Sequence, residues 1–243
     1  MVDRRERAMD QAYKAAGLTP YYETEHVVLY HGDAVDILPL FATGAMAAVV
    51  TDPPYVTGTS SSQRRIGHVD LLNAARFYSA WYRLAAAAID DAGALWTCAS
   101  WRTLPVVLYA AAEAGLPVTA AAVWDKLWIG PGSNRGLRSR YEMCLLLPRP
   151  GFRVRDRGAG DVWRIQASSR KPHGHPAQKP ETLMRHILDI TEPPPGGVIL
   201  DPFAGSGTTL AAARAAGYGA VGIEASERWC EVIATRLDAA DAG

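Results

Sequence analysis

Cysteine is scarce in this sequence, and the few that occur form no pattern. The three cysteines, Cys98, Cys144 and Cys230, are odd in number and far apart, which excludes a disulfide framework and indicates thiols in a reducing compartment. Long apolar runs are also missing, since Asp90–Asp91 interrupts an alanine-rich stretch. Residues 1–17 lack the apolar centre of a signal peptide. These absences predict a soluble, cytoplasmic protein with no membrane partner.

The sequence also lacks net charge, with 25 basic and 25 acidic residues. This balance argues against a protein whose whole surface binds a polyanion, but it is compatible with local basic patches. A metal centre is not expected either. His173 and His175 are close together but have no neighbouring cysteine or acid to complete a ligand set.

What the sequence does contain is an alternation of strand and helix patterns. Its 243 residues, 49% of them hydrophobic, suffice for one large α/β domain or two small ones, without internal repeats. Such alternation is typical of a doubly wound, mostly parallel sheet, and we expect a single domain over residues 1–243. The expected strands cover residues 26–34, 46–55, 93–100, 118–126, 141–148 and 218–226. The expected helices cover residues 1–17, 70–90, 104–115 and 180–192, and a strand, a glycine turn and a helix follow one another over 196–217.

Four acidic residues stand at the ends of expected strands. Asp33, Asp52, Asp201 and Glu224 each follow an apolar run. Open parallel sheets bind ligands beyond the carboxyl ends of their strands. The turns after these four residues should therefore cluster and form a binding site.

The stretch VILDPFAGSGTTL, residues 198–210, contains the glycine turn. Gly205 and Gly207 allow a ligand to approach the backbone, and the following helix directs free N–H groups at it. Glu224 lies about 20 residues further on, the usual distance for an acid that binds ribose hydroxyls. Thr208 stands near the place of the third glycine of a dinucleotide fingerprint, and no Gly-Lys-Ser/Thr follows. The pattern therefore predicts a nucleoside-containing ligand.

A second motif, VVTDPPYVTG at residues 49–58, ends an apolar strand with an acid, two prolines and an aromatic ring. DPPY at 52–55, HPAQKP at 175–180 and the glycine turn together resemble the S-adenosylmethionine-dependent amino-methyltransferases of DNA. Their order resembles the class called beta. The resemblance extends from about Tyr21 to about Leu237 and implies a Rossmann-like class I methyltransferase fold.

The resemblance gives the DPPY element a catalytic role that chemistry supports. An exocyclic amine is a poor nucleophile because its lone pair is conjugated into the base. Asp52 and the Pro53 carbonyl would each accept one amine hydrogen and orient the nitrogen toward the methyl group, and prolines hold such a carbonyl in place. Tyr55 would stack on a target base flipped from the duplex. The implied catalytic residues are Asp52, Pro53, Pro54 and Tyr55.

The cofactor implied is S-adenosylmethionine. By resemblance, Asp201 lies near the methionyl amino group, Glu224 binds the ribose and Asp33 meets the adenine amino group, while HPAQKP closes over the methionyl end. Ala177 stands where the family often has threonine, so one hydroxyl contact is expected to be missing. The implied cofactor-binding residues are Asp33, Lys179, Asp201, Phe203, Gly205, Gly207, Thr208 and Glu224.

Basic residues concentrate between Pro131 and Lys179, where 11 basic and three acidic residues give a net charge of +8. Beside base-modifying motifs, this run predicts a phosphate-contacting surface. Residues 148–174 occupy the place of the family's target-recognition segment, and residues 56–68 are expected to form a mobile lid over the base. The predicted DNA-contacting residues are Arg135, Arg138, Arg140, Arg153, Arg155 and Arg157.

The expected function is N6-adenine methylation of double-stranded DNA, because relatives acting on cytosine N4 more often have serine in place of Asp52. Methylation of cytosine N4 or of RNA stays open, as does a catalytically silent nucleic-acid-binding protein, although an intact Asp52 and Tyr55 argue against silence. A homodimer is among the expected assemblies, since relatives of this class often pair.

Overall fold

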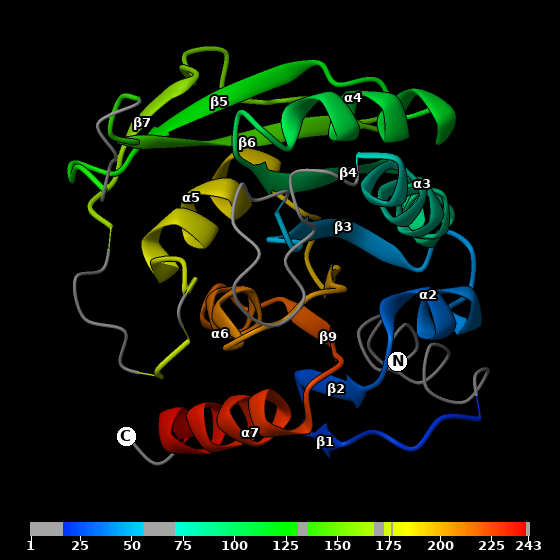
Figure 1. Ribbon diagram of the computed structural model, residues 1–243. Coiled ribbons are helices and arrows are strands. Elements are labelled where there is room, and N and C mark those ends of the chain that lie inside the picture. Colours follow the sequence, from blue (N-terminus) through cyan, green and yellow to red (C-terminus); the bar gives the residue numbers. More distant parts are fainter. Residues whose placement is uncertain (1–16, 56–70, 131–135, 168–172, 176, 242–243) are drawn as a thin grey trace.

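The structure, a computed structural model, describes residues 17–55, 71–130, 136–167, 173–175 and 177–241. A nine-stranded sheet forms its centre, in the order β1-β2-β9-β8-β3-β4-β6-β5-β7 (Figure 1). The strands are β1 (Tyr22–Glu23), β2 (Val27–His31), β3 (Met46–Thr51), β4 (Ile89–Ala99), β5 (Ala120–Asp125), β6 (Tyr141–Pro148), β7 (Val162–Arg164), β8 (Val198–Asp201) and β9 (Gly219–Glu224). The helices are α2 (Ala34–Ile37), the 3-10 turn η1 (Leu38–Leu40), α3 (Leu71–Ala88), α4 (Leu104–Glu113), α5 (Glu181–Thr191), α6 (Thr208–Ala215) and α7 (Glu227–Asp241).

Parallel pairing dominates the sheet. Strands β2, β9, β8, β3 and β4 are parallel neighbours and therefore end at one edge, the carboxyl edge. The sequence of β3, MAAVVT, is buried along its whole length, as in strands covered on both faces. β6 runs antiparallel between β4 and β5, so β5 ends at the carboxyl edge and β6 begins there.

Helices cover both faces of the sheet. Figure 1 shows α3 and α4 on one side and α5 and α6 on the other. Neighbouring residues of a strand point to opposite faces. In β3, Val49 therefore belongs to the apolar cluster that contains Trp81 of α3, whereas Val50 belongs to the cluster that contains Leu183 of α5 and Leu210 of α6.

Helix ends follow the expected signals. α5 begins after Pro180 and ends at Thr191. The next residue, Glu192, has a φ of 42° and precedes three prolines. α4 carries a proline in its first turn and ends just before Gly115, whose φ is 68°. Proline restricts the start of a helix little, and a left-handed residue stops one.

The expected α/β fold with a doubly wound, mostly parallel sheet is confirmed. The sequence patterns missed β1, β7, α2, η1 and α7 and did not indicate that β6 is antiparallel. β1 and β7 have only two and three residues, too few for a periodic pattern. β7 lies in the segment 148–174 and adds a strand to the sheet. The expected helix over residues 1–17 and the lid over residues 56–68 fall almost entirely on residues that the structure does not describe.

All three cysteines are buried and free, as their spacing predicted. Cys98 Sγ and Cys144 Sγ lie 3.9 Å apart at paired positions of β4 and β6. Within the described ranges, no helix combines the length and the apolar character that a membrane span requires.

Candidate active site

The four acids expected at strand ends lie together at the carboxyl edge. Glu224 ends β9, Asp201 ends β8, and Asp52 directly follows β3. Asp33 follows β2 and caps α2 by accepting a hydrogen bond from the backbone N–H of Val35 (2.9 Å). Since β2, β9, β8 and β3 are neighbours in the sheet, the expected gathering of these strand ends is confirmed.

Glycine is required in the turn between β8 and α6. Gly205 and Gly207 have φ values of 55° and 74°, which L side chains rarely adopt. A Cβ on Gly207 would also lie 3.0 Å from the side chain of Ile233. Glu224 holds the turn by accepting hydrogen bonds from the backbone N–H groups of Gly205 (2.9 Å) and Ser226 (2.8 Å). The turn thus presents backbone to a ligand at the N-terminus of α6.

Two other residues assigned to the cofactor by resemblance face the protein interior. The hydroxyl of Thr208 lies 3.2 Å from Arg236 Nη1, which also donates to the carbonyl of Ser206 (2.8 Å). Nη2 of the same arginine donates to Glu181 at the start of α5 (2.9 Å). The Phe203 ring packs against the aromatic cluster of α3. No sequence pattern pointed to Arg236, which ties the glycine turn to α5.

Asp201 is a buried carboxylate beneath the turn. It accepts hydrogen bonds from Thr51 Oγ1 (2.6 Å) and the backbone N–H of Phe203 (3.1 Å). Burial raises the pKa of Asp201 to about 6, against the lowering effect of these donors. The carboxylate is therefore ionised at neutral pH at a cost to stability, a cost that a bound cation could offset.

We predict a pH-dependent effect of Asp201→Asn on stability. Because the pKa of Asp201 is higher in the folded than in the unfolded state, the wild type should lose stability as pH rises from about 4 to about 6. The asparagine variant lacks this loss, so its stability relative to wild type should rise by about 2 kcal/mol between pH 4 and pH 7. Urea unfolding at both pH values measures this, with the exposed Asp36→Asn as control. A stability difference between the variant and wild type that does not change with pH would contradict a buried, ionised Asp201.

His175, at the start of the HPAQKP segment, lies beside the glycine turn. The His175 ring lies 3.6 Å from the position that a Cβ of Gly205 would take. It packs edge-on against Trp229 of α7, with ring centroids 4.5 Å apart. At the end of the segment, however, the buried Lys179 extends to Asp52 (2.5 Å between Nζ and Oδ2). The resemblance assigned this lysine to the cofactor, whereas the structure pairs it with the DPPY element.

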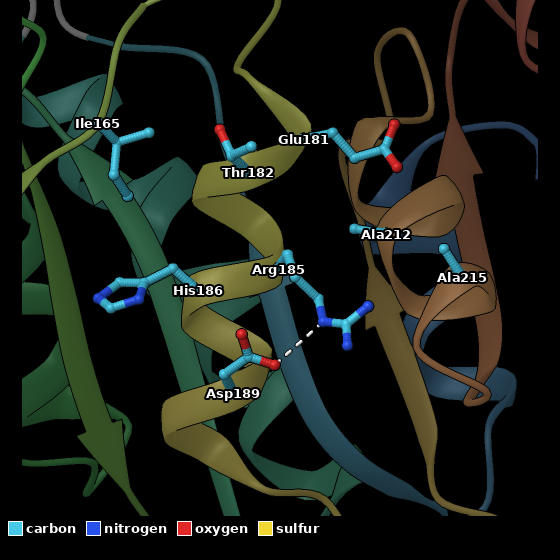
Figure 2. A pocket seen from close by; sticks show the side chains of 8 residues that line it. All are labelled: Ile165, Glu181, Thr182, Arg185, His186, Asp189, Ala212 and Ala215. Carbon is cyan, nitrogen blue, oxygen red and sulfur yellow. Dashed lines mark hydrogen bonds and ion pairs between the residues drawn. The ribbon is translucent and has the colours of Figure 1, made fainter.

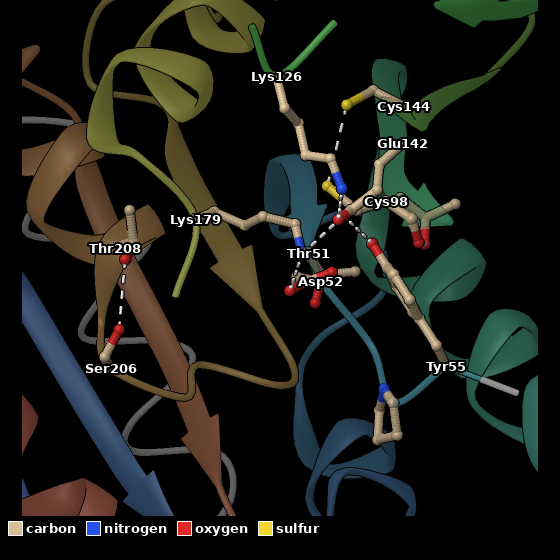
Figure 3. Close-up of polar contacts among 12 residues, drawn as sticks. Thr51, Asp52, Tyr55, Cys98, Lys126, Glu142, Cys144, Lys179, Ser206 and Thr208 are labelled. Carbon is tan, nitrogen blue, oxygen red and sulfur yellow. Dashed lines mark hydrogen bonds and ion pairs between the residues drawn. The ribbon is translucent and has the colours of Figure 1, made fainter. Parts of the chain in front are cut away.

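Five side chains from distant parts of the chain form a polar network around the DPPY element (Figure 3). Lys179 Nζ lies 2.5 Å from Asp52 Oδ2 and 3.1 Å from Glu142 Oε2. Lys126 Nζ lies 3.2 Å from Glu142 Oε1. The Tyr55 hydroxyl donates to Glu142 Oε2 (3.1 Å). We call these five residues the DPPY site.

The charges of the DPPY site balance, with two carboxylates and two ammonium groups. Burial raises the pKa of Asp52, although Lys179 opposes the shift. For Glu142, burial also raises the pKa, but the two lysines outweigh it and the pKa is lowered. Burial lowers the pKa of Lys179, but the two carboxylates outweigh it and raise that pKa. Glu142 is thus the firmly ionised acid, and Asp52 is the better proton acceptor.

One oxygen of Asp52 lacks a hydrogen-bond donor in the described part of the chain. Oδ1 is buried and accepts no hydrogen bond from any residue that the structure describes, while Oδ2 is held by Lys179. A buried oxygen without a donor costs free energy in the protein alone. The arrangement fits a ligand that brings its own N–H group to Oδ1.

The rest of the DPPY element is fixed by α3. The hydroxyl of Tyr78 donates to the carbonyl of Pro54 (2.8 Å), and Pro53 is buried. The Tyr55 ring lies under Lys179, with Nζ 5.0 Å from the ring centroid. Sequence reasoning missed Tyr78 and Glu142. For Glu142, a charged residue near the start of the apolar run YEMCLLLP was an available signal.

Two of the predicted DNA-contacting arginines lie at the carboxyl edge, in the loop between β5 and β6. Arg140 forms a two-point ion pair with Asp125 (2.7 and 2.9 Å). Arg138 donates to the carbonyl of Gly130 in the same loop (2.8 Å). Arg135 lies outside the described residues.

Arg153, Arg155 and Arg157 lie on the segment that follows β6 and starts at the opposite edge. The backbone N–H of Gly151 donates to a carbonyl near the beginning of β4 (2.8 Å). Arg155 lies 3.5 Å from Glu192, at the end of α5. The structure does not bring these three arginines to the DPPY site, and their contact with DNA stays a prediction.

A separate surface pocket of about 400 Å³ lies beside α5 and α6 (Figure 2). Two of its lining residues, Arg185 and Asp189, form an ion pair over one turn of α5 (3.0 Å). The DPPY site and the glycine turn contribute no lining residue. The lining residues are Ile165, Glu181, Thr182, Arg185, His186, Asp189, Ala212 and Ala215.

Comparison with known proteins gives consistent matches. Residues 46–235 match the family described as DNA methylase, N6_N4_Mtase. The chain is 27% identical to the Type II methyltransferase M.ScaI of Streptomyces caespitosus, over 93% of this chain and 86% of that protein. In fold it is similar to the PvuII DNA methyltransferase (cytosine-N4-specific), with a TM-score of 0.75, 16% identity and coverage of 91% of this chain and 89% of that one. It is also similar to the M1.HpyAVI–SAM complex, with a TM-score of 0.70, 23% identity and coverage of 87% and 99%.

The matched region includes both the DPPY site and the glycine turn, the two features that the geometry brings to one edge of the sheet. The chain therefore belongs to the N6_N4_Mtase family of DNA methylases.

Proposed function

We propose that this DNA amino-methyltransferase transfers a methyl group from S-adenosylmethionine to N6 of adenine in double-stranded DNA. The observation that carries the proposal is Asp52 Oδ1, which is buried without a donor among the described residues, while Lys179 holds Oδ2. Such an oxygen suits an exocyclic amine that enters with its own hydrogens. The aspartate itself favours adenine, because similar enzymes acting on cytosine N4 more often have serine at this position.

The residues in and around the DPPY site have different roles toward the target base. Lys179 fixes the carboxylate plane through Oδ2, so Oδ1 can accept one amine hydrogen, and Tyr78 fixes the proline pair whose Pro53 carbonyl accepts the other. Oriented acceptors localise the nitrogen lone pair at no reorganisation cost during the reaction. The raised pKa of Asp52 suits Oδ1 to take the proton that the amine must lose. Tyr55 supports the base flipped from the duplex.

The cofactor residues fit a methyl donor with a nucleoside and an amino-acid end. The glycine turn exposes backbone at a helix N-terminus, and the acids Asp33, Asp201 and Glu224 line neighbouring strand ends. Asp201 would meet the methionyl ammonium group and Glu224 the ribose, with Asp33 at the adenine. When bound, S-adenosylmethionine supplies an electrophilic methyl group on a sulfonium.

We predict that Glu224→Gln weakens S-adenosylmethionine binding by roughly 10- to 100-fold, the loss of a charged hydrogen-bond acceptor. Isothermal titration calorimetry measures this. Glu227→Gln, a change at an exposed acid three residues away, should leave affinity unchanged. Equal affinity of the Glu224 variant and wild type, with unchanged thermal unfolding, would remove Glu224 from the cofactor site.

The proposed reaction is tested by incubating mixed-sequence duplex DNA and RNA separately with the protein and methyl-labelled S-adenosylmethionine. Mass spectrometry of the released nucleosides should show N6-methyladenine from duplex DNA alone. N4-methylcytosine would favour the second candidate, which the fold similarity to a cytosine-N4-specific enzyme supports. Label in RNA only would overturn the DNA substrate, and no label in either would indicate a catalytically silent protein.

A further inference from the structure

Three neighbouring strands present an exposed aromatic ring at the carboxyl edge. Trp101 stands two residues after β4, Tyr141 begins β6, and Trp128 stands three residues after β5. Their side chains are 56%, 42% and 53% exposed. Because β4, β6 and β5 are consecutive in the sheet, and neighbouring strands are about 5 Å apart, the residues that carry these rings stand in order along the carboxyl edge. We call these three residues the aromatic row.

The row borders the DPPY site along the carboxyl edge, with the Tyr141 side chain on the opposite face of β6 from Glu142. Tyr141 immediately precedes Glu142, which contacts Lys179 and the hydroxyl of Tyr55. Trp128 follows two residues after Lys126, the other lysine on Glu142. The ends of β5 and β6 therefore carry residues of both the network and the row, and the end of β4 lies beside them in the sheet.

Positive charge accompanies the rings. The guanidinium of Arg102 lies 4.4 Å from the centroid of Trp101. Arg138 is exposed in the loop that carries Trp128 and donates to a carbonyl of that loop. Neither arginine has an acidic partner among the described residues. Exposed rings alternating with unneutralised arginines are the composition of surfaces that hold unstacked nucleic-acid bases.

We propose that the aromatic row is a docking surface for DNA that has been opened at the target base, with its rings stacking on bases unstacked by the flip. The inference rests on the proposed function and adds the surface on which the rest of the substrate lies. A second copy of this chain is the competing occupant. In a contact between two copies, Arg102 and Arg138 would lie near the same arginines of the other copy, and the repulsion between like charges disfavours this contact. The phosphates of DNA would instead neutralise both arginines.

The test uses fluorescence anisotropy of two labelled 30-base-pair duplexes, one fully paired and one with a single unpaired adenine. Trp101→Ala, Tyr141→Ala and Trp128→Ala should each weaken binding to the duplex with the unpaired adenine by roughly 5- to 100-fold. The salt dependence of affinity should stay unchanged, because stacking releases no counterions. Arg102→Ala should lower the log–log salt slope by about one unit.

Matched variants separate stacking from folding. Tyr109→Ala removes a ring of similar exposure (55%) from the outer face of α4 and should leave affinity unchanged. Trp101→Phe, Tyr141→Phe and Trp128→Phe each keep a stacking ring and should retain most of the affinity for the duplex with the unpaired adenine. Full affinity of the alanine variants, or loss only in the combined alanine variant of Arg153, Arg155 and Arg157, would overturn the inference.

Three further outcomes are distinguishable. If the alanine variants turn a dimer into a monomer in sedimentation and lose DNA only for that reason, the row joins two copies of the chain. If wild type methylates DNA while row variants bind it normally, only the inference fails. If wild type methylates no nucleic acid, the proposed function fails, and the effect of the row on affinity is still measured.

Discussion

Asp52→Asn should lower methyl-transfer turnover by about 100- to 1,000-fold, the usual effect of removing one preorganised electrostatic contact to the reacting group. The change keeps the size of the side chain but replaces a charged acceptor by an amide. Oδ1 of Asp52 is the oxygen without a donor among the described residues, and Oδ2 is bound to Lys179, so both functions of the carboxylate are altered. Single-turnover kinetics with duplex DNA measure the loss.

Cofactor binding should survive this change, because Asp52 lies in the DPPY site and not in the glycine turn. Calorimetric affinity for S-adenosylmethionine should therefore stay within about twofold of wild type. Asp36→Asn, at an exposed acid of α2, should retain full turnover. If Asp52→Asn kept more than about a tenth of wild-type turnover, a loss under about 1.4 kcal/mol, the carboxylate would not be the amine acceptor.

Lys179→Met should destabilise the protein by about 3–5 kcal/mol at neutral pH and abolish activity. The lysine is 7% exposed and contacts both Asp52 and Glu142. Without it, Glu142 keeps Lys126, but Asp52 has no ammonium partner among the described residues. Breaking a buried ion pair from one side leaves uncompensated charge. Urea unfolding measures the loss.

The pH dependence of this loss follows from the remaining acids. The pKa of Asp52 is already raised by burial, and removal of the lysine raises it further. A folded-state pKa above the unfolded one means that stability falls as pH rises between the two. The deficit of Lys179→Met should therefore be smaller at pH 5 than at pH 8.

A second substitution tests whether uncompensated negative charge causes the stability loss of Lys179→Met. Glu142→Gln in the Lys179→Met background should restore part of the stability, although Glu142→Gln alone should be destabilising. Arg185→Met removes one partner of a surface ion pair (3.0 Å from Asp189) and should change stability by under about 1 kcal/mol. Additive losses in the double variant, or an equal deficit at both pH values, would contradict this account of the network.

Local sequence patterns were sufficient to predict the strand-end acids and the glycine turn of the site. Apolar runs such as that of β3 are buried on both faces of a parallel sheet, and the acid after each run then lies at its carboxyl edge. The glycines of the turn were also predictable, because a positive φ at Gly205 and Gly207 excludes other residues. These features depend on residues within one or two elements.

The DPPY site could be predicted only in part. Asp52 and Tyr55 stand in a local motif, but Lys179 lies 127 residues from Asp52 in the chain. Glu142 reaches the site because β6 begins at the carboxyl edge, and only the antiparallel direction of β6 places it there. No periodic pattern specifies the direction of a buried strand.

The position of the basic residues could likewise be predicted only in part from the sequence. Sequence located the excess of positive charge between Pro131 and Lys179, but charge alone does not tell on which side of a sheet a residue lies. The reversal of β6 separates Arg138 and Arg140, at the carboxyl edge, from Arg153 and Arg155, which follow the far end of that strand. The sequence by itself thus determined the chemistry of this protein and the strand ends that carry it. The tertiary structure decided which distant charges meet Asp52, because strand direction and sheet order depend on packing between elements.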